Sequence, residues 1–322
     1  MRLFIIILFF TLKLISFIYS SSTSTSGATL LKQFAGSRAP AMGEAFTAVS
    51  DDIYALHYNP AGLVKIEKEF SAIYYKDQTV NFNYGLLAYG QSFNKIGVLA
   101  GSLFVYDSGK IEFEDDSGNL QSFNMQRDYL YTLGFARNIV KSLSLGVNLR
   151  LYSSTIIEQY NAKAYSMDIG TLCDTPVKGL SFGVVMQNMG TPMKYIEEKD
   201  PLPATLRIGT AYRFQLNDGH KFIVSADIVK PNDSDIKKNF GTEFSIKDLI
   251  YLRAGYKMGY DLEKYSFGVG IRLSEFRIDY GAILQKFLII NPISVSWKKD
   301  KNQEKPAKLE EKSETISPEV PK

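Results

Sequence analysis

The chain of 322 residues has one cysteine, one tryptophan and two histidines, and its formal net charge is only +3. A single cysteine excludes a disulfide scaffold and a thiolate metal cluster. The 37 basic and 34 acidic residues are interleaved, whereas a nucleic-acid-binding surface needs Lys and Arg in clear excess and clustered. The sequence is instead rich in Tyr (20), Phe (21) and Gly (24). This composition favours many strands and tight turns over helices.

The first 22 residues have the pattern of a secretory signal peptide. Arg2 gives a positive start, Leu3 to Ile18 is apolar except for Lys13 and a few hydroxyls, and small residues follow from Ser20. A transmembrane anchor is the alternative, but this stretch of about 16 residues is shorter than the roughly 20 that a helical span needs. Cys173 lies far from the cleavage zone, which excludes lipoprotein processing. We therefore expect residues 1–22 to direct export.

No later segment reaches 18 continuous apolar residues, so a membrane-embedded form of this protein would have to use strands. Alternating residues support strands. One side of the segment 142–153 carries Leu143, Leu145, Val147, Leu149 and Leu151. The other side carries Ser142, Ser144, Gly146, Asn148, Arg150 and Tyr152. Such alternation fits a soluble sandwich as well as a membrane barrel, so it leaves both open.

The lengths of strands and loops favour the barrel. We predict about 14 strands between residues 69 and 297, most of them near the roughly 9 to 11 residues of a tilted membrane-spanning strand. The predicted ranges are 69–76, 82–92, 95–106, 127–139, 142–157, 162–175, 179–189, 202–214, 220–229, 237–247, 250–261, 263–273, 276–285 and 288–297. Tight connections such as 139–142 alternate with long polar ones at 107–126 and 190–201. This asymmetry is typical of an outer-membrane barrel, with a secreted sandwich or propeller as alternatives.

Several residues inside the predicted strands are unusual for strand interiors. Glycines recur there, for example at Gly146, Gly170 and Gly209, and indicate sheet curvature or the close approach of another backbone within the lumen. Charged side chains also fall within the strands, and we expect them to line a solvated lumen. They include Arg150, Arg207, Arg213, Arg272 and Asp279.

The segment of residues 23–68, which precedes the predicted barrel, does not read as a strand. Residues 36–63 have the sequence GSRAPAMGEAFTAVSDDIYALHYNPAGL. The Ala-rich part from Ala41 to Val49 predicts a helix, and the residues from Ser50 to Asp52 suit the cap of a second short helix. The turn from Asn59 to Gly62 must end that second helix, because Pro60 lacks a backbone donor and Gly62 permits a left-handed conformation.

This stretch resembles the N-terminal region of the PorV/PorQ family of bacterial outer-membrane proteins, a branch of the FadL-like barrels. The resemblance rests on the run G-x-R-A-x-x-M-G-x-A-F-T-A-V-x-D-D over residues 36–52 and on Y-N-P-A-G-L over residues 58–63. The motif residues are Gly36, Arg38, Met42, Gly43, Asp51 and Asp52. The resemblance implies an all-β fold: a transmembrane antiparallel β-barrel of about 14 strands whose small helical N-terminal segment forms a hatch in the lumen.

Two features depart from this pattern. His57 stands where an aromatic or small residue would be less surprising, and residues 298–322 follow the last predicted strand after Trp297. This tail contains Lys, acidic residues and prolines with few apolar residues, so we expect it to be a disordered charged tail. Its position after Trp297 leaves the end of the barrel undefined.

Nothing in the sequence favours an enzyme. Ser50, Asp51 and His57 are close in sequence, but the pattern gives no reason for them to face one another. Asp115, Ser117 and Asn119 lack the glycine and distal glutamate of a calcium loop. No metal or organic cofactor is implied, and we predict a protein without catalytic activity.

The resemblance implies two functions of different class for a barrel in the bacterial outer membrane. FadL-like members take up hydrophobic compounds, and here a solute would move when the hatch residues Asn59, Pro60, Ala61 and Gly62 rearrange. PorV-type members act in type IX secretion, and here the loops 107–126 and 190–201 would hold a secreted protein or a secretion-complex partner. Outer-membrane lipid is the expected surrounding in both cases. We expect passage of hydrophobic small molecules, with the non-enzymatic secretion scaffold or shuttle as the alternative.

Overall fold

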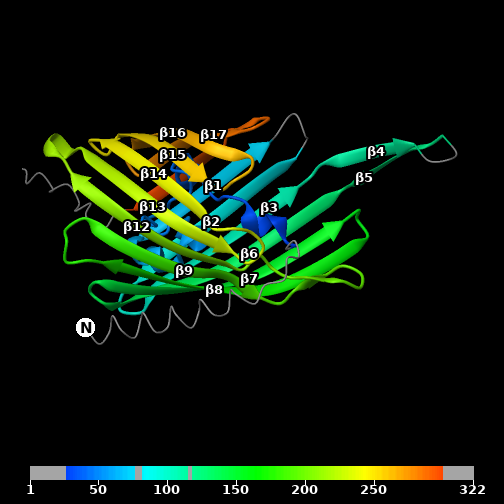
Figure 1. The fold of residues 1–322 in the computed structure, drawn as a ribbon, viewed down its shortest axis with the longest axis horizontal. Coiled ribbons are helices and arrows are strands. Elements are labelled where there is room, and N and C mark those ends of the chain that lie inside the picture. The colour runs from blue at the N-terminus through cyan, green and yellow to red at the C-terminus, as the bar shows by residue number, and fades with distance from the viewer. Residues whose placement is uncertain (1–26, 77–81, 115–117, 300–322) are drawn as a thin grey trace, which may run out of the picture.

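The computed structural model describes residues 27–76, 82–114 and 118–299. Fourteen antiparallel strands close into one barrel (Figure 1). These are β1 (Lys68–Lys76), β2 (Asn83–Phe93), β3 (Gly97–Asp107), β6 (Gln126–Val140), β7 (Leu143–Ile156), β8 (Tyr160–Asp174), β9 (Leu180–Gly190), β12 (Thr205–Gln215), β13 (Lys221–Pro231), β14 (Lys237–Ile246), β15 (Ile250–Met258), β16 (Glu263–Leu273), β17 (Phe276–Gln285) and β19 (Ile293–Lys299). Each strand pairs with its neighbour along the chain, and β1 pairs with β19 to close the sheet. The predicted all-β barrel is confirmed, while the expected signal peptide and residues 300–322 lie outside the described residues.

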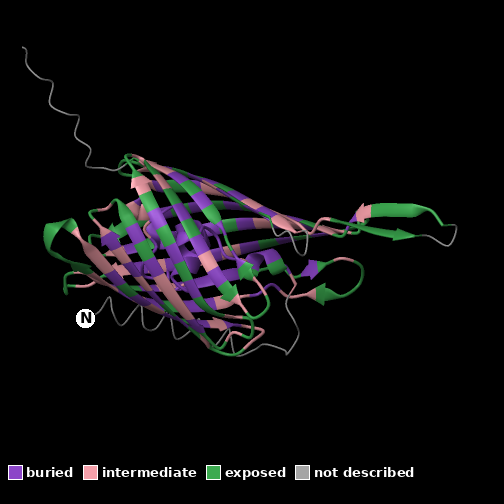
Figure 2. Ribbon diagram, turned by 90° about the horizontal axis from the view of Figure 1, so that it is seen from above, coloured by how far each residue is buried: buried purple, intermediate pink, exposed green. Residues whose placement is uncertain are grey.

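The wall is apolar outside and polar inside. On β7, Leu145 and Leu149 are exposed, whereas Ser144, Gly146 and Asn148 face the lumen and are buried. The same alternation appears along the other strands in Figure 2, where exposed and buried residues follow one another. A soluble protein hides its apolar strand face, so exposed leucines over a buried polar face identify a wall that faces lipid.

The two rims of the barrel differ. One rim carries the turns at 94–96, 141–142, 175–179, 216–220, 247–249 and 274–275, and we call it the short-turn rim. The turn at 216–220 includes the 3-10 helix η3 (Asn217–Gly219). The start of β1 and the end of β19 lie at this rim, because Lys68 pairs with Lys299. The other, long-loop rim carries two small hairpins, β4 (Lys110–Glu114) with β5 (Leu120–Asn124) and β10 (Met193–Lys194) with β11 (Lys199–Asp200).

The last predicted strand, 288–297, is two strands in the structure. The short β18 (Ile289–Ile290) pairs with β17, and β19 begins only at Ile293. Pro292 separates the two, because proline has no N–H to donate to the ladder. The barrel then continues to Lys299, two residues beyond the predicted end.

The segment from Gly27 to Glu67, which we call the hatch, lies inside the barrel (Figure 1). It contains the 3-10 helices η1 (Thr29–Lys32) and η2 (Pro60–Lys65) and the single-turn helices α2 (Arg38–Ala41) and α3 (Ala55–Tyr58). No helix among the described residues is long and apolar enough to cross a membrane.

The predicted helix from Ala41 to Val49 is wrong. Helix α2 ends at Ala41, because Gly43 and Glu44 both adopt positive φ angles, of 61° and 56°. A left-handed pair of residues cannot continue a right-handed helix. The prediction that the segment from Asn59 to Gly62 ends the second helix is correct, since Asn59 follows α3 in an extended conformation. Gly62 does not adopt a left-handed conformation there, because it belongs to η2, which the Asn59 side chain caps by accepting from the Ala61 N–H.

Candidate functional site

The hatch fills the middle of the lumen, and most of its side chains are fully buried. Ala39, Met42, Phe46, Val49 and Ile53 are each 0% exposed. They belong to one apolar core that also includes lumen-facing aromatic residues of β2 and β3, namely Tyr84 and Phe104. This core makes the hatch an integral part of the barrel.

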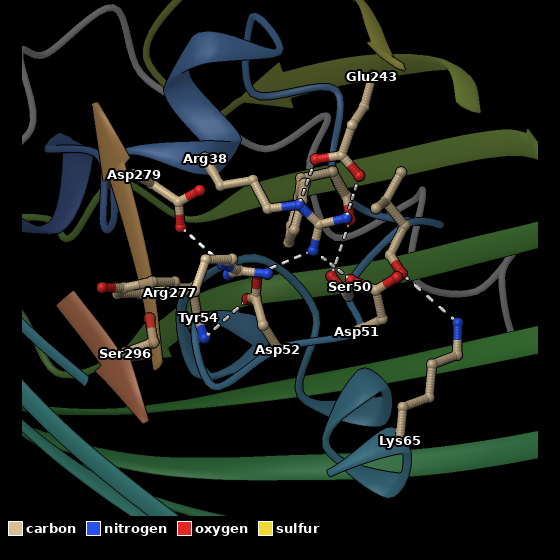
Figure 3. A network of polar contacts seen from close by, with 12 residues as sticks. Arg38, Ser50, Asp51, Asp52, Tyr54, Lys65, Glu243, Arg277, Asp279 and Ser296 are labelled. Carbon is tan, nitrogen blue, oxygen red and sulfur yellow. Dashed lines mark hydrogen bonds and ion pairs between the residues drawn. The ribbon is translucent and has the colours of Figure 1, made fainter. Parts of the chain in front are cut away.

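A closed ring of ion pairs joins the hatch to one side of the wall, and Figure 3 labels its members other than Arg253. The ring consists of Arg38, Glu243, Arg253, Asp279, Arg277 and Asp52, taken in order around it. Two members come from the hatch, and the other four come from β14, β15 and β17. Every side chain in it is at most 14% exposed. We call this set the ion-pair ring.

Arg38 is the junction of the ion-pair ring. Its guanidinium donates to both carboxylate oxygens of Glu243, at 2.7 and 2.8 Å, and to Asp52 at 3.0 Å. It also donates to Asp51 at 2.5 Å. Bidentate arginine–carboxylate pairs fix orientation as well as distance. The hatch is thereby held in one position relative to β14.

Asp51 lies where several cations converge. Burial opposes ionisation of this carboxyl, but Arg38, Arg213 and Lys65 outweigh it and hold the pKa of Asp51 well below its usual range. For Lys65 the charged form is disfavoured instead, because burial and the charge of Arg213 lower its pKa to about 8. Asp51 therefore stays ionised as a fixed counter-charge.

The predicted gating residues Asn59 to Gly62 are held firmly against the opposite side of the wall. The Asn59 amide donates to the carbonyl oxygens of Thr47 in the hatch, at 2.9 Å, and Thr171 on β8, at 3.0 Å. A Cβ added to Gly170 would lie 2.1 Å from Asn59 Oδ1, and one added to Gly146 would lie 2.2 Å from the Pro60 carbonyl carbon. Gly146 thus leaves room for the hatch backbone, and Gly170 leaves room for the Asn59 side chain.

Lumen-facing glycines that touch the hatch recur around the wall. They include Gly146, Gly170, Gly183, Gly209, Gly241, Gly255 and Gly268, and we call them the glycine belt. Neighbouring members lie directly opposite one another, as in Gly146 with Gly170 and Gly241 with Gly255. The motif residues Met42 and Gly43 rest on this belt, because a Cβ on Gly241 would meet the Met42 carbonyl oxygen at 2.4 Å and one on Gly255 the Gly43 nitrogen at 2.0 Å. Gly36, with φ of 81°, lies instead against the Tyr54 ring. Of the three glycines named from the sequence, Gly146 admits the backbone of Pro60 and Ala61, whereas Gly170 and Gly209 admit side-chain atoms.

The hatch separates two cavities. The outer cavity, at the long-loop rim, has a volume of about 620 Å³. Its apolar lining includes Leu31, Phe34, Tyr58, Phe82, Leu288 and Ile290. The inner cavity, at the short-turn rim, has a volume of about 350 Å³ and is lined mainly by charged residues, including Arg38, Asp51, Lys65 and Arg213. The two linings share no residue.

This separation also places the three residues considered for catalysis. Asp51 lines the inner cavity and His57 the outer one, while the Ser50 hydroxyl donates to the Phe46 carbonyl oxygen at 2.8 Å. The His57 ring packs beside Phe104, and burial together with the charge of Arg150 lowers its pKa well below the usual value. The structure does not bring Ser50, Asp51 and His57 together as a triad.

One seam in the wall beside the outer cavity lacks regular pairing. The ladder between β9 and β12 ends at the pair Gln187 and Thr205. Beyond that pair, β9 continues through Asn188, which has a φ of 59°, and the register between β8 and β9 shifts. The Asn188 side chain bridges the gap by donating to the Pro203 carbonyl oxygen at 3.1 Å.

The seam lies between the outer cavity and the outside of the barrel. Its inner side, formed by Gln187, Asn188, Pro203 and Thr205, lines the outer cavity. On the outer side, Met186 and Leu206 form a small apolar cluster with Val184, Met189 and Ala204. Met186 is only 2% exposed although it is on the lipid-facing side of β9.

Sequence reasoning named Arg38, Asp52 and Asp279 but missed Glu243, Arg253 and Arg277. A signal was available, because all three lie in strands predicted to alternate, where a charged residue belongs on the lumen side. Arg272, which was expected in the lumen, lines the inner cavity. The alternation does not predict which of these charged residues form ion pairs with one another.

Comparison with known proteins extends the geometric description. A family model described as the type IX secretion system protein PorV matches residues 20–232. Among curated proteins, none has a sequence significantly similar to this one.

Solved structures share the fold. The toluene transporter TbuX of Ralstonia pickettii superposes with a TM-score of 0.56 at 14% identity, over 82% of this chain and 98% of that one. The P. putida toluene transporter TodX gives 0.53 at 13% identity, over 83% and 99%. The monoaromatic hydrocarbon channel CymD gives 0.56 at 12% identity, over 83% and 98%. These similarities establish a common barrel architecture.

Proposed function

Because the chain belongs to the PorV family and has the barrel of outer-membrane transport proteins, we propose that it passes hydrophobic small molecules across the outer membrane. The molecule binds in the outer cavity and leaves sideways through the seam between β9 and β12. The observation that carries this proposal is the contrast between the floor and the side wall of that cavity. The floor is the hatch, and the side wall is the seam.

Opening the floor would be costly. Moving the hatch would break the contacts of Arg38 with Glu243 and would separate Asn59 from Thr171. Breaking a buried ion pair costs about 3–5 kcal/mol when one partner is left uncompensated. Rearrangement of Asn59 to Gly62 is therefore a poor route for the solute.

Opening the side wall would cost much less. Beyond Gln187 and Thr205 there is no regular ladder between β9 and β12 to break, and the Asn188–Pro203 hydrogen bond crosses the gap. A neutral hydrogen bond contributes about 0.5–1.5 kcal/mol net. An apolar molecule that passes the seam also meets Met186 and Leu206, so it moves from the apolar part of the outer cavity towards lipid.

A disulfide across the seam tests this route. Asn188→Cys and Pro203→Cys, in a Cys173→Ala background, would tie β9 to the segment before β12. A matched hatch lock, Ala48→Cys with Ser181→Cys, uses two residues already joined by a hydrogen bond of 3.1 Å. Entry of the fluorescent hydrophobe N-phenylnaphthylamine into cells is measured before and after reduction.

We expect the oxidised seam lock to block entry and reduction to restore it, while the hatch lock leaves entry unchanged. Entry that persists through the oxidised seam would contradict the lateral route. Entry that stops only with the hatch lock would instead favour rearrangement of Asn59 to Gly62.

The family match favours a second function, a role as a scaffold or shuttle in type IX secretion. Of the two loops expected to hold a partner, the one from Gly190 to Pro201 folds back onto the barrel. Met193 is fully buried, and the Tyr195 hydroxyl donates to Ser154 at 2.8 Å. The hairpin β4–β5 instead extends beyond the rim (Figures 1 and 2).

Deletion of one loop at a time tests the secretion role. We expect replacement of residues 110–124 by a short Gly-Ser linker to lower the amount of cargo at the cell surface, because this loop is free to meet a partner. Replacement of residues 191–200 should disturb the barrel itself. Normal surface display without the hairpin would argue against this second function.

A further inference from the structure

The hairpin β4–β5 stands apart from the barrel wall. Its two strands pair only with each other among the described residues, and it projects away from the rim as a narrow ribbon (Figure 2). An isolated two-stranded hairpin is marginally stable in water. A long extension of this kind therefore needs support at its base, along its face or along its edges.

The base is well supported. The Asn124 N–H donates to the Glu158 carboxylate at 3.0 Å, and the Ile157 N–H donates to the Met125 carbonyl oxygen at 2.9 Å. Arg127 and Asp107 form an ion pair across the foot of the hairpin, at 2.9 Å. These contacts with the β7–β8 turn and across the foot set the direction in which the hairpin leaves the barrel.

The two faces of the hairpin differ in chemistry. Ile111 lies opposite Phe123, and the Phe113 and Phe123 rings meet edge to face with centroids 5.5 Å apart. Phe113 remains 44% exposed. The opposite face carries Lys110, Glu112 and Glu114 on β4, with the exposed Leu120 of β5 across from Glu114. The full loop 107–126 has five acidic residues and one lysine.

Both edges of the hairpin lack a partner strand among the described residues, and the edge of β4 is the one that carries carboxylates on one face and Ile111 and Phe113 on the other. A third strand added to this edge would satisfy its unpaired backbone N–H and C=O groups, as in β-strand addition. The added strand would extend the apolar face with its own apolar residues. On the other face it would meet Glu112 and Glu114, which favour lysine or arginine directly opposite.

We propose that the β4 edge is a docking site for an extended segment of a partner protein in which apolar residues alternate with lysine or arginine. The carboxylates disfavour the anionic head groups of a lipid surface, since like charges repel. The site is independent of solute passage, because neither Glu112 nor Phe113 lines the outer cavity.

A synthetic peptide probes the site directly. The full-length protein in lipid nanodiscs is titrated with the terminally blocked peptide Lys-Phe-Lys-Val-Lys-Phe, labelled for fluorescence anisotropy. Two controls accompany it: the peptide with Glu in place of Lys, and the Lys peptide N-methylated at the backbone positions that would pair with β4. Glu112→Gln with Glu114→Gln removes the carboxylates, and Phe113→Ser removes the aromatic contact. Glu197→Gln with Glu198→Gln is the matched charge control in the other long loop.

We expect the lysine peptide to bind, with affinity that falls as salt is raised, and the two control peptides not to bind. Each hairpin variant should weaken binding about three- to ten-fold, which corresponds to the loss of one or two cross-strand pairs. The Glu197/Glu198 variant should bind as the parent does, and all variants should keep normal entry of N-phenylnaphthylamine.

Three results would overturn the proposal. Equal binding of the N-methylated peptide would show that the β4 backbone is not used. If the Glu197/Glu198 variant weakened binding of the lysine peptide equally, the effect would come from the overall negative charge of the protein and not from the β4 edge. Photocrosslinking from position 113 to a second copy of this chain, or to lipid, would assign the hairpin to a different occupant.

Discussion

The barrel holds the hatch in different ways on its two sides. Towards β14, β15 and β17 the ion-pair ring acts together with belt glycines, because Met42 and Gly43 rest on Gly241 and Gly255. Towards β7 and β8 no ion pair among the described residues joins hatch and wall, and the contacts include the Asn59–Thr171 hydrogen bond together with the close packing of Asn59 and Pro60 on Gly170 and Gly146. Charges thus hold the hatch on one side only, whereas glycines admit it on both. The comparison indicates that the hatch is a structural plug, and three substitutions test it.

The largest effect is expected on the side of the ion-pair ring. Glu243→Ala leaves Arg38 and Arg253 buried with fewer counter-charges, so the free energy of unfolding should fall by about 3–5 kcal/mol. Urea unfolding of the protein in lipid vesicles measures it. The control Glu112→Ala, on the exposed hairpin, should change stability by less than about 0.5 kcal/mol. Similar losses in the two variants would show that the ring does not hold the hatch.

A smaller effect is expected on the side of β7 and β8. Gly146→Ala adds a methyl group 2.2 Å from the carbonyl carbon of Pro60, so the hatch backbone must shift. Overpacking of this kind costs about 1–3 kcal/mol. Gly101→Ala is the matched control, because its nearest contact is Leu133 at 3.5 Å. If the two alanine variants unfold at the same urea concentration, the glycine belt is not needed to seat the hatch.

The third effect is a pH dependence that arises from Lys65, and over a single pH unit it is the smallest of the three. Burial and Arg213 lower its pKa to about 8 in the folded protein, whereas the unfolded chain keeps the ordinary value of 10.5. Between these values the unfolded state binds the extra proton, so stability should rise with pH, by at most about 1.4 kcal/mol per unit. Lys65→Met should remove this rise, and Lys178→Met, in an exposed turn, should retain it. An unchanged slope in Lys65→Met would exclude Lys65 as its source.

The alternation of residues predicted thirteen of the fourteen strands to within about three residues at each end, because each strand has one face in lipid and one in a polar lumen. It missed the break at Pro292 in the last predicted strand. It did not predict the strands β4 and β5, because residues 107–126 read as a long polar loop with a hairpin turn. It also misjudged the segment from Ala41 to Val49, where helix-forming residues are overridden by the turn at Gly43 and Glu44. The helix preference of these residues is overridden because Met42 and Gly43 must pack against the glycine belt.

For the site, the sequence alone determined that Arg38, Asp52 and the residues from Asn59 to Gly62 belong to one N-terminal unit. The tertiary structure decided what they do. Arg38 meets Glu243 across 205 residues of sequence, and Asn59 meets Thr171 across 112. Alternation specifies which face of a strand a residue occupies. Closure of the barrel decides which residues lie opposite one another across the lumen. The local alternation of residues contains no information about these pairs, because their members are far apart in the sequence.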